Sequence, residues 1–197
     1  PFLAKDRDPM SKAAVVVEAI REREEAFIRR AIERWERNPN LQILGSHSLS
    51  RLSIVSFVVR HAGRYVHHNL VVALLNDLFG IQSRGGCSCA GPYGHRLLGI
   101  DIETSHEFER EIERGCEGIK PGWIRVNFNY FISDAVFEFI LDAVDFVATD
   151  GWRLAPEYRF DAGTGLWRHS GGTAEPPLTL RDVRYVDGTM RGRSSTS

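Results

Sequence analysis

The sequence predicts an α/β fold, in which a two-layer small domain has a short mixed sheet covered by helices. Three observations lead to this prediction. Apolar and β-branched residues fill 52–60 almost without interruption, which is typical of a strand covered on both faces. A helical pattern follows at 69–79. A second apolar strand pattern at 123–129 then leads into an apolar helical pattern at 133–148.

The composition is compatible with one domain and an ordinary core. Of the 197 residues, 43% are hydrophobic and 26% are charged. The formal net charge is −1, so nothing electrostatic indicates nucleic acid as a partner. No apolar run reaches the length of a membrane-spanning segment, and we expect no membrane partner. Two of the three cysteines form a C-x-C sequence, an awkward spacing for a mutual disulfide, so we expect free thiols in the cytoplasm.

A long helix is expected near the start of the chain, after a polar lead-in. Ile20, Phe27 and Ala31 recur at helical spacing within 12–37, while arginine and glutamate fill the opposite face. A helix of this length cannot bury its apolar stripe on itself. We therefore expect it to pack across the rest of the chain or to connect two domains.

A strand–helix–strand unit is expected next. A short strand at 41–44 precedes the strand at 52–60. Asn69 can cap the following helix, which should stop at Gly80, and the next strand should occupy 81–84.

Two helices and one strand are expected further along. Thr104 and Glu107 have the spacing of a capping box at the start of a charged helix. After the strand at 123–129, Ser133 should open a helix that runs through Ala148. This helix is hydrophobic almost all round, which predicts deep burial.

The composition changes after residue 150. The segments 158–160 and 166–168, with a turn sequence between them, predict a β-hairpin. A further strand is expected at 182–186 and a disordered tail at 189–197. The expected organisation is a lead-in and connector helix at 1–39, a small domain at 40–150, and a β-rich extension with a disordered tail at 151–197.

The glycine-rich stretch 80–95 carries two of the thiols, Cys87 and Cys89. Arg84 precedes them and His95 follows, so a thiol here would lie in a positive field. Such a field lowers the pKa of the thiol and raises the fraction of the reactive thiolate. The alternative interpretation is a glycine-rich turn between a strand and a helix, with two buried thiols.

Three segments, in this order, resemble a known family. The strand 54–57 ends in Ser-Phe, GIQSRGGCSCAGP follows at 80–92, and IRVNFNY at 124–130 leads into the last apolar helix. Together they are similar to the C-terminal small domain of class V aminotransferases, pyridoxal phosphate (PLP) enzymes of fold type I. Within that group they resemble cysteine desulfurases and selenocysteine lyases. The cysteine loop also looks like that of molybdenum cofactor sulfurases. The resemblance covers about 10–150.

The resemblance implies four site residues. Cys89 falls on the family's catalytic cysteine, which attacks the substrate sulfur and becomes a persulfide. Arg125 falls on the arginine that binds the substrate α-carboxylate, and a guanidinium suits that task because it binds a carboxylate bidentately. Arg84 and Asn127 are assigned to the substrate-binding wall, although desulfurases more often have serine at the Asn127 position. The alternative for Arg125 is a structural ion pair at the sheet edge.

The family's cofactor lysine lies on a large domain upstream of the small one. The contexts of Lys5, Lys12 and Lys120 do not match the segment that carries it. The resemblance therefore implies that this chain is the C-terminal part of a longer PLP enzyme, inactive and free of PLP by itself. The expected partners are a cysteine-like amino-acid substrate, the large domain of the same polypeptide and a second copy in a homodimer.

Two other classes of function compete with this interpretation. A metal-binding module would use Cys87, Cys89 and His95, with Cys116 as a further ligand, although C-x-C is tighter than the usual structural zinc spacing. His67-His68 is a further candidate for a metal or phosphate contact, against the interpretation of a solvated loop pair. A protein-interaction module would use the apolar stripe of the first helix.

Overall fold

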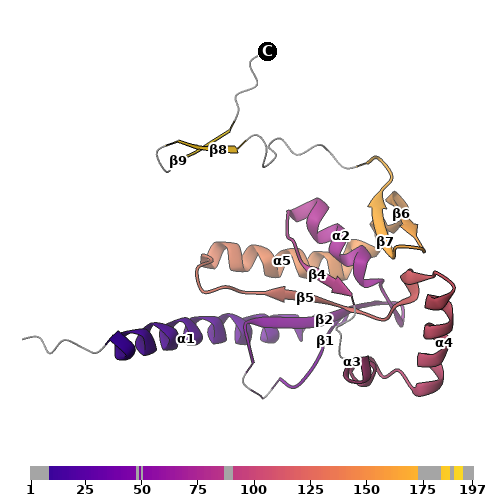
Figure 1. Cartoon of the computed structure of the whole chain (residues 1–197), viewed down its shortest axis with the longest axis horizontal. Coiled ribbons are helices and arrows are strands. Elements are labelled where there is room, and N and C mark those ends of the chain that lie inside the picture. The colour runs from indigo at the N-terminus through magenta and orange to yellow at the C-terminus, as the bar shows by residue number, and fades with distance from the viewer. Residues whose placement is uncertain are drawn as a thin grey trace, which may run out of the picture.

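A small antiparallel sheet forms the centre of the molecule (Figure 1). The computed structural model describes residues 9–47, 49, 51–86, 91–172, 183–186 and 189–192. The strands pair in the order β1 (Leu41–Ile43), β2 (Ile54–His61), β5 (Trp123–Asn127) and β4 (Arg84–Gly86), and β3 (Arg64–Tyr65) pairs with β2. Since β2 and β4 are each antiparallel to β5 between them, they run in the same direction. The expected strand–helix–strand unit therefore exists, with β5 inserted into it, but its second strand occupies 84–86 and not the predicted 81–84.

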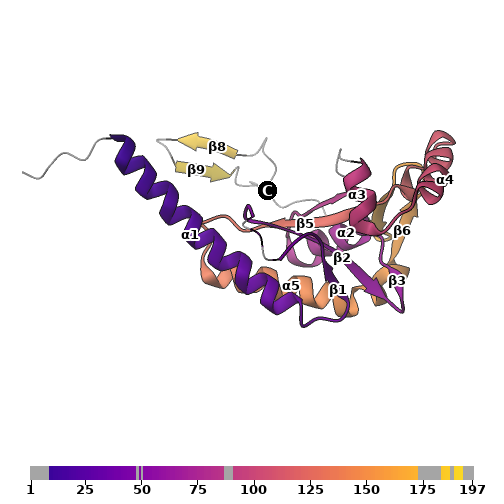
Figure 2. The same cartoon turned by 90° about the horizontal axis from the view of Figure 1, so that it is seen from below.

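Three helices cover one face of this sheet, which confirms the two-layer α/β fold. They are α1 (Pro9–Trp35), α2 (His68–Phe79) and α5 (Asp134–Asp150). In Figure 2, α5 and the C-terminal half of α1 lie below the sheet. Alternate residues of the strands point into this layer because side chains alternate between the faces of a strand. The strand residues buried there are Val55, Phe57 and Val59 of β2 and Ile124 and Val126 of β5.

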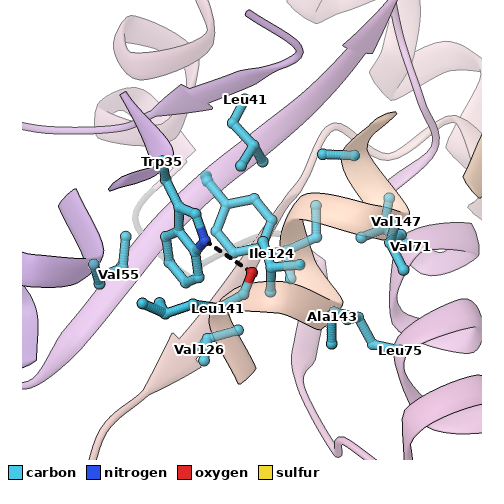
Figure 3. Packing of buried hydrophobic residues seen from close by; sticks show 14 of the residues in the cluster. Trp35, Leu41, Val55, Val71, Leu75, Ile124, Val126, Leu141, Ala143 and Val147 are labelled. Carbon is cyan, nitrogen blue, oxygen red and sulfur yellow. Dashed lines mark hydrogen bonds between the residues drawn. The ribbon is translucent and has the colours of Figure 1, made fainter. Parts of the chain in front are cut away.

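Trp35 joins α1 to α5 and to the sheet. Its side chain is fully buried, and its indole N–H donates to the carbonyl oxygen of Leu141 at 3.4 Å (Figure 3). The indole ring lies 5.4 Å from the ring of Phe57 and 5.9 Å from that of Phe128, centroid to centroid. An indole packs a large apolar surface and needs one hydrogen-bond acceptor, and this position supplies both.

The two halves of α1 have different surroundings. Phe27, Ile28 and Trp35 are buried against the core, whereas Val15 and Val17 are 57% and 64% exposed. The first half projects away from the sheet (Figure 2). The expectation that this helix packs across the rest of the chain is therefore met by its C-terminal half.

The last long helix departs from one expectation. Ser133 caps α5 as expected, because its hydroxyl accepts from the N–H of Val136 at 3.2 Å. The prediction of deep burial holds for one face of the helix and not for the other, since Phe137 and Leu141 are buried but Val136, Phe139 and Phe146 are 45–48% exposed. The buried face of α5 meets α1, α2 and the sheet, whereas Phe139 and Phe146 are covered only in part, by the ring of Phe79 at the end of α2.

Two helix caps also differ from the prediction. His67, and not Asn69, caps α2, because its imidazole Nδ1 accepts from the N–H of Asn69 at 3.2 Å. The stop at Gly80 is confirmed, with φ at +66°. The charged helix α4 (Ile102–Glu113) is capped by Asp101, whose carboxylate accepts from the N–H of Thr104 at 2.8 Å. Aspartate satisfies the free N–H groups of a first turn as well as threonine does.

The other face of the sheet is covered in part by α3 (Gly91–Leu98). Leu98 packs on a small cluster formed by Leu44, Val58 and Trp123. The chain continues through α4 and the short 3₁₀ turn η1 (Glu117–Ile119) before it enters β5.

The expected hairpin of the C-terminal extension is confirmed. After the 3₁₀ segment η2 (Gly151–Glu157), β6 (Tyr158–Asp161) pairs with β7 (Leu166–His169). Tyr158 is buried in the main core, and its hydroxyl donates to Asp77 of α2 at 3.0 Å. Burial, helped by this hydrogen bond, raises the pKa of Tyr158 to about 12. The hairpin is thus packed on α2.

The second hairpin corrects the prediction for the tail. Strand β8 (Val183–Val186) falls in the segment expected to be a strand, and it pairs with β9 (Thr189–Gly192). The prediction of disorder from residue 189 is therefore wrong for 189–192. None of the helices in the described ranges has both the length and the apolar character needed to cross a membrane.

Candidate functional site

A row of polar residues crosses the sheet on the face opposite α1, α2 and α5. Arg125 of β5 pairs with Ser56 of β2 on one side and with Arg84 of β4 on the other. Directly opposite residues of antiparallel strands point to the same face. Asn127 lies two residues after Arg125 on the same strand and so shares that face.

The guanidinium group of Arg125 has unused donors. The side chain is half-buried, and its Nε and Nη2 atoms are shielded from solvent without a hydrogen-bond partner among the described residues. Its central carbon lies 5.8 Å from the ring centroid of Trp123. A buried donor without a partner costs about 1–3 kcal/mol, more when it is charged, so the site favours an anionic ligand.

The three described candidate residues line one cleft of about 410 Å³. No acidic side chain lines it, and no ion pair between described residues involves Arg84 or Arg125. The alternative of a structural ion pair for Arg125 is therefore not seen in the described part of the chain. The lining residues are Leu52, Ser53, Ile54, Gln82, Ser83, Arg84, Arg125, Val126 and Asn127.

Sequence reasoning missed Ser83 as a member of this cleft. Its hydroxyl oxygen is shielded from solvent and has no partner among the described residues. The only signal in the sequence is its place directly before Arg84, in a segment expected to be a strand. Asn127 has a partner just after the end of β5, because its amide donates to the side-chain oxygen of Asn129 at 3.2 Å.

Cys89 lies outside the described residues, as does Cys87. Gly86, the last described residue before Cys87, pairs with Trp123 of β5. Whether the thiol of Cys89 shares the cleft with Arg125 stays a prediction.

The His67-His68 pair is not a solvated loop pair, and that interpretation is wrong. The rings stack with centroids 4.5 Å apart, and His68 is buried. Since Nδ1 of His67 accepts from Asn69, its proton lies on Nε2, which donates to the carbonyl oxygen of Gly118 at 3.0 Å. Burial lowers the pKa of His67, and burial with repulsion from His67 lowers that of His68 to about 4. Both rings are therefore neutral at pH 7.

The described ranges hold no group of metal ligands and no lysine in the cleft of Arg84 and Arg125. No three histidine, cysteine, aspartate or glutamate side chains come together there as metal ligands. No lysine lines the cleft of Arg84 and Arg125. Lys120 lies in a separate pocket and is paired with Glu117. These residues therefore do not provide the amine that PLP needs for its covalent link to a protein.

No protein-family model matches this chain, and no curated protein matches it.

Proposed function

We propose that this chain is the small domain of a class V aminotransferase-like PLP enzyme and that it binds the carboxylate of an amino-acid substrate. The observation that carries the proposal is a pair of buried guanidinium nitrogens of Arg125 that have no partner among the described residues and lie beside an open cleft. A guanidinium presents two parallel N–H groups, which match the two oxygens of a carboxylate.

The neighbours of Arg125 support an anion as its partner. Arg84 lies directly opposite on β4, and Ser83 adds a shielded hydroxyl to the same cleft. Two like charges opposite each other on neighbouring strands repel, and a bound anion would remove that repulsion. Because Ile124 and Val126 are buried, they hold β5 against the core and keep Arg125 in place.

The proposal assigns the cofactor to another part of a longer polypeptide. The described residues offer no lysine in the cleft, so their proposed role is substrate binding alone. The proposal includes a large domain that supplies the cofactor, a homodimeric assembly and a cytoplasmic location.

The role of Cys89 is the second part of the proposal. In a desulfurase-like enzyme this thiol would take up the sulfur of a cysteine-like substrate. Sulfide release from L-cysteine, measured on the polypeptide that includes the cofactor domain and with a thiol added to reduce the persulfide, tests this role. Cys89→Ala should abolish release and Cys116→Ala, the matched control, should not. Unchanged release in Cys89→Ala would remove Cys89 from the proposal.

Carboxylate binding can be measured on the chain itself. L-cysteine and cysteamine share a thiol and an amine, but only L-cysteine has a carboxylate. We expect L-cysteine to shift the Nε–H resonance of Arg125 in a saturable way and cysteamine to leave it unchanged. Arg125→Gln should abolish the binding.

Arg60→Gln is the matched control, because Arg60 lies on β2 of the same sheet and stacks on Tyr65, outside the cleft. This variant should bind L-cysteine like the unmodified chain. Equal responses to L-cysteine and cysteamine, or equal losses in Arg125→Gln and Arg60→Gln, would show that Arg125 is not a carboxylate site.

A further inference from the structure

A second pocket lies between the sheet and the segment that connects α3 to β5. Its volume of about 360 Å³ falls within the range of small-molecule sites, roughly 300–1,000 Å³. It shares no lining residue with the cleft of Arg125. The walls are formed by Val58, Tyr65, Val66, His67, His68, Leu98, Ile100, Phe108, Gly118, Ile119, Lys120, Pro121, Gly122 and Ile124.

The pocket exists because α4 does not fill the space beside the sheet with buried side chains. No residue of α4 is buried, and its apolar side chain Phe108 is only half-buried at the pocket wall. Ile119 of η1, on the same wall, is 37% exposed. Apolar side chains that face an open space lose contacts that a ligand could restore.

Of the uncharged polar side chains that line this pocket, Tyr65 is 51% exposed and His67 uses both of its ring nitrogens, which leaves His68 as the shielded one. The residue is only 8% exposed, and among the described residues no hydrogen bond is made by its ring nitrogens. In contrast, His67 uses both of its nitrogens, with Asn69 and Gly118. A neutral imidazole can donate from one nitrogen and accept at the other.

The ring of His68 is held in place by close packing. It stacks on His67, and a Cβ atom added to Gly122 would lie 2.8 Å from its Cε1 atom. The same Cβ would lie 2.7 Å from the backbone carbonyl carbon of Gly86. Glycine at 122 therefore permits the close approach of the ring. Turning the ring away from the pocket wall would cost energy.

The charges at the pocket balance. Lys120 is the charged lining residue, and its ammonium group is paired with the carboxylate of Glu117. The two histidines are neutral at pH 7, so the pocket presents no free charge to a ligand. An ionic ligand would lose hydration there without gaining a counter-ion.

From this geometry we infer a binding site for a small uncharged molecule with a mostly apolar body and one hydroxyl or amide group that hydrogen-bonds to His68. The apolar body fills the space between Phe108, Ile119 and the sheet. The site is independent of the proposed carboxylate cleft.

Phenol, benzene and benzoate test three parts of this inference on the full 197-residue chain, namely the apolar body, the hydrogen bond to His68 and the absence of charge. Binding is followed by the Cε1–H resonance of His68 and the methyl resonances of Leu98 and Ile119. We expect phenol to bind with a dissociation constant on the order of 1 mM. Benzene should bind about fivefold more weakly, because it lacks the hydrogen bond. Benzoate should bind more weakly than phenol.

Two variants separate the hydrogen bond from the apolar pocket. His68→Phe should remove the preference for phenol over benzene while both still bind. Ile119→Trp should fill the pocket and abolish both, whereas Ile102→Trp, on an α4 side chain that is 77% exposed and outside the pocket, should abolish neither.

Several results would overturn the inference. Resonances of the pocket that do not saturate with phenol or benzene would mean that there is no site, and a phenol preference retained in His68→Phe would mean that His68 is not its polar group. Benzoate binding as tight as phenol binding would exclude the uncharged class. The Nε–H resonance of Arg125 distinguishes the two sites, because phenol should leave it unchanged whether or not the carboxylate proposal holds.

Discussion

Arg84 and Arg125 face each other across β4 and β5, and no acidic side chain lines their cleft. Like charges directly opposite on neighbouring strands destabilise a sheet. Arg125 also keeps two shielded nitrogens without a partner among the described residues. At this position the sheet is therefore less stable than it could be, as expected where a site is shaped for a ligand.

Replacing one arginine of the pair should increase the stability of the fold and weaken carboxylate binding. We expect Arg84→Gln to raise the free energy of unfolding by about 0.2–1 kcal/mol at low salt and to weaken carboxylate binding. In 1 M NaCl the gain should shrink, because the Debye length falls to about 3 Å. Urea unfolding at both salt concentrations measures this. Arg96→Gln, on exposed α3, is the control, and a loss of stability in Arg84→Gln at low salt would contradict the expectation.

His68 makes stability depend on acid. Its pKa is lowered from 6.5 to about 4 by burial and by His67, so the neutral ring is favoured in the folded state. The contribution of the neutral His68 ring to the free energy of unfolding is fully present above pH 6.5 and is lost as pH falls from 6.5 toward 4. A shift of this size corresponds to a loss on the order of 3 kcal/mol.

Urea unfolding at pH 7 and pH 4.5 measures this loss. His68→Phe keeps a ring of similar size without a proton to gain, so it should lose less stability between the two pH values than the unmodified chain. His106→Phe, on the exposed surface of α4, should lose as much as the unmodified chain. Equal acid sensitivity in all three proteins would show that His68 does not titrate as described.

At the scale of elements, α1 combines a buried half with an exposed half. Trp35 and Phe27 pack on α5 and the sheet, and Arg34 bonds to Asp145 at 2.7 Å and to Asp142. The side chains of 13–19 are exposed and are not part of this core. The stability of this helix therefore comes from tertiary packing of its C-terminal half.

Two alanine substitutions on this helix should lower the free energy of unfolding by different amounts. Ile28→Ala removes a buried side chain and should cost about 2–4 kcal/mol. Val16→Ala removes a side chain that is 57% exposed and should change stability by less than about 0.5 kcal/mol. Thermal or urea unfolding of the pair measures the difference. Similar costs for both would mean that the first half of α1 is packed in solution.

At the scale of the whole molecule, the segment 151–172 is part of the main core. Tyr158 is buried with the residues of α2 and α5, and its hydroxyl is bonded to Asp77. The hairpin also reaches η1 and α2, because Asn69 donates to the carbonyl oxygen of Gly165 at 2.7 Å and the N–H of Gly118 donates to Ala162 at 2.8 Å. The hairpin therefore supports the loop that carries His67.

Two truncations test this role. A chain that ends at Asp150 should lose at least about 3 kcal/mol of stability, because a buried aromatic residue and its hydrogen bond are removed. A chain that ends at Gly172 should keep its stability, since β8 pairs only with β9 among the described strands. Circular dichroism during thermal unfolding measures both. Equal stability of the two truncated chains would show that the hairpin is a separate unit.

The local sequence predicts most of the elements because each depends on neighbouring residues. Apolar periodicity locates α1, α2 and α5, the glycine at 80 ends α2, and the hairpin of β6 and β7 follows from its turn sequence. The cap at Asp101 was missed because two polar residues within one turn can serve the same N–H groups.

The sequence by itself predicted the fold class and the order of the main elements, and the resemblance to class V aminotransferases implied the candidate residues Arg84, Arg125 and Asn127. Only the tertiary structure decided that β5 inserts between β2 and β4, which places the two arginines opposite each other. It also decided that one face of α5 stays exposed and that His68 is buried in a pocket. Periodicity reports which side of an element is apolar, whereas pairing and burial depend on segments that are distant along the chain.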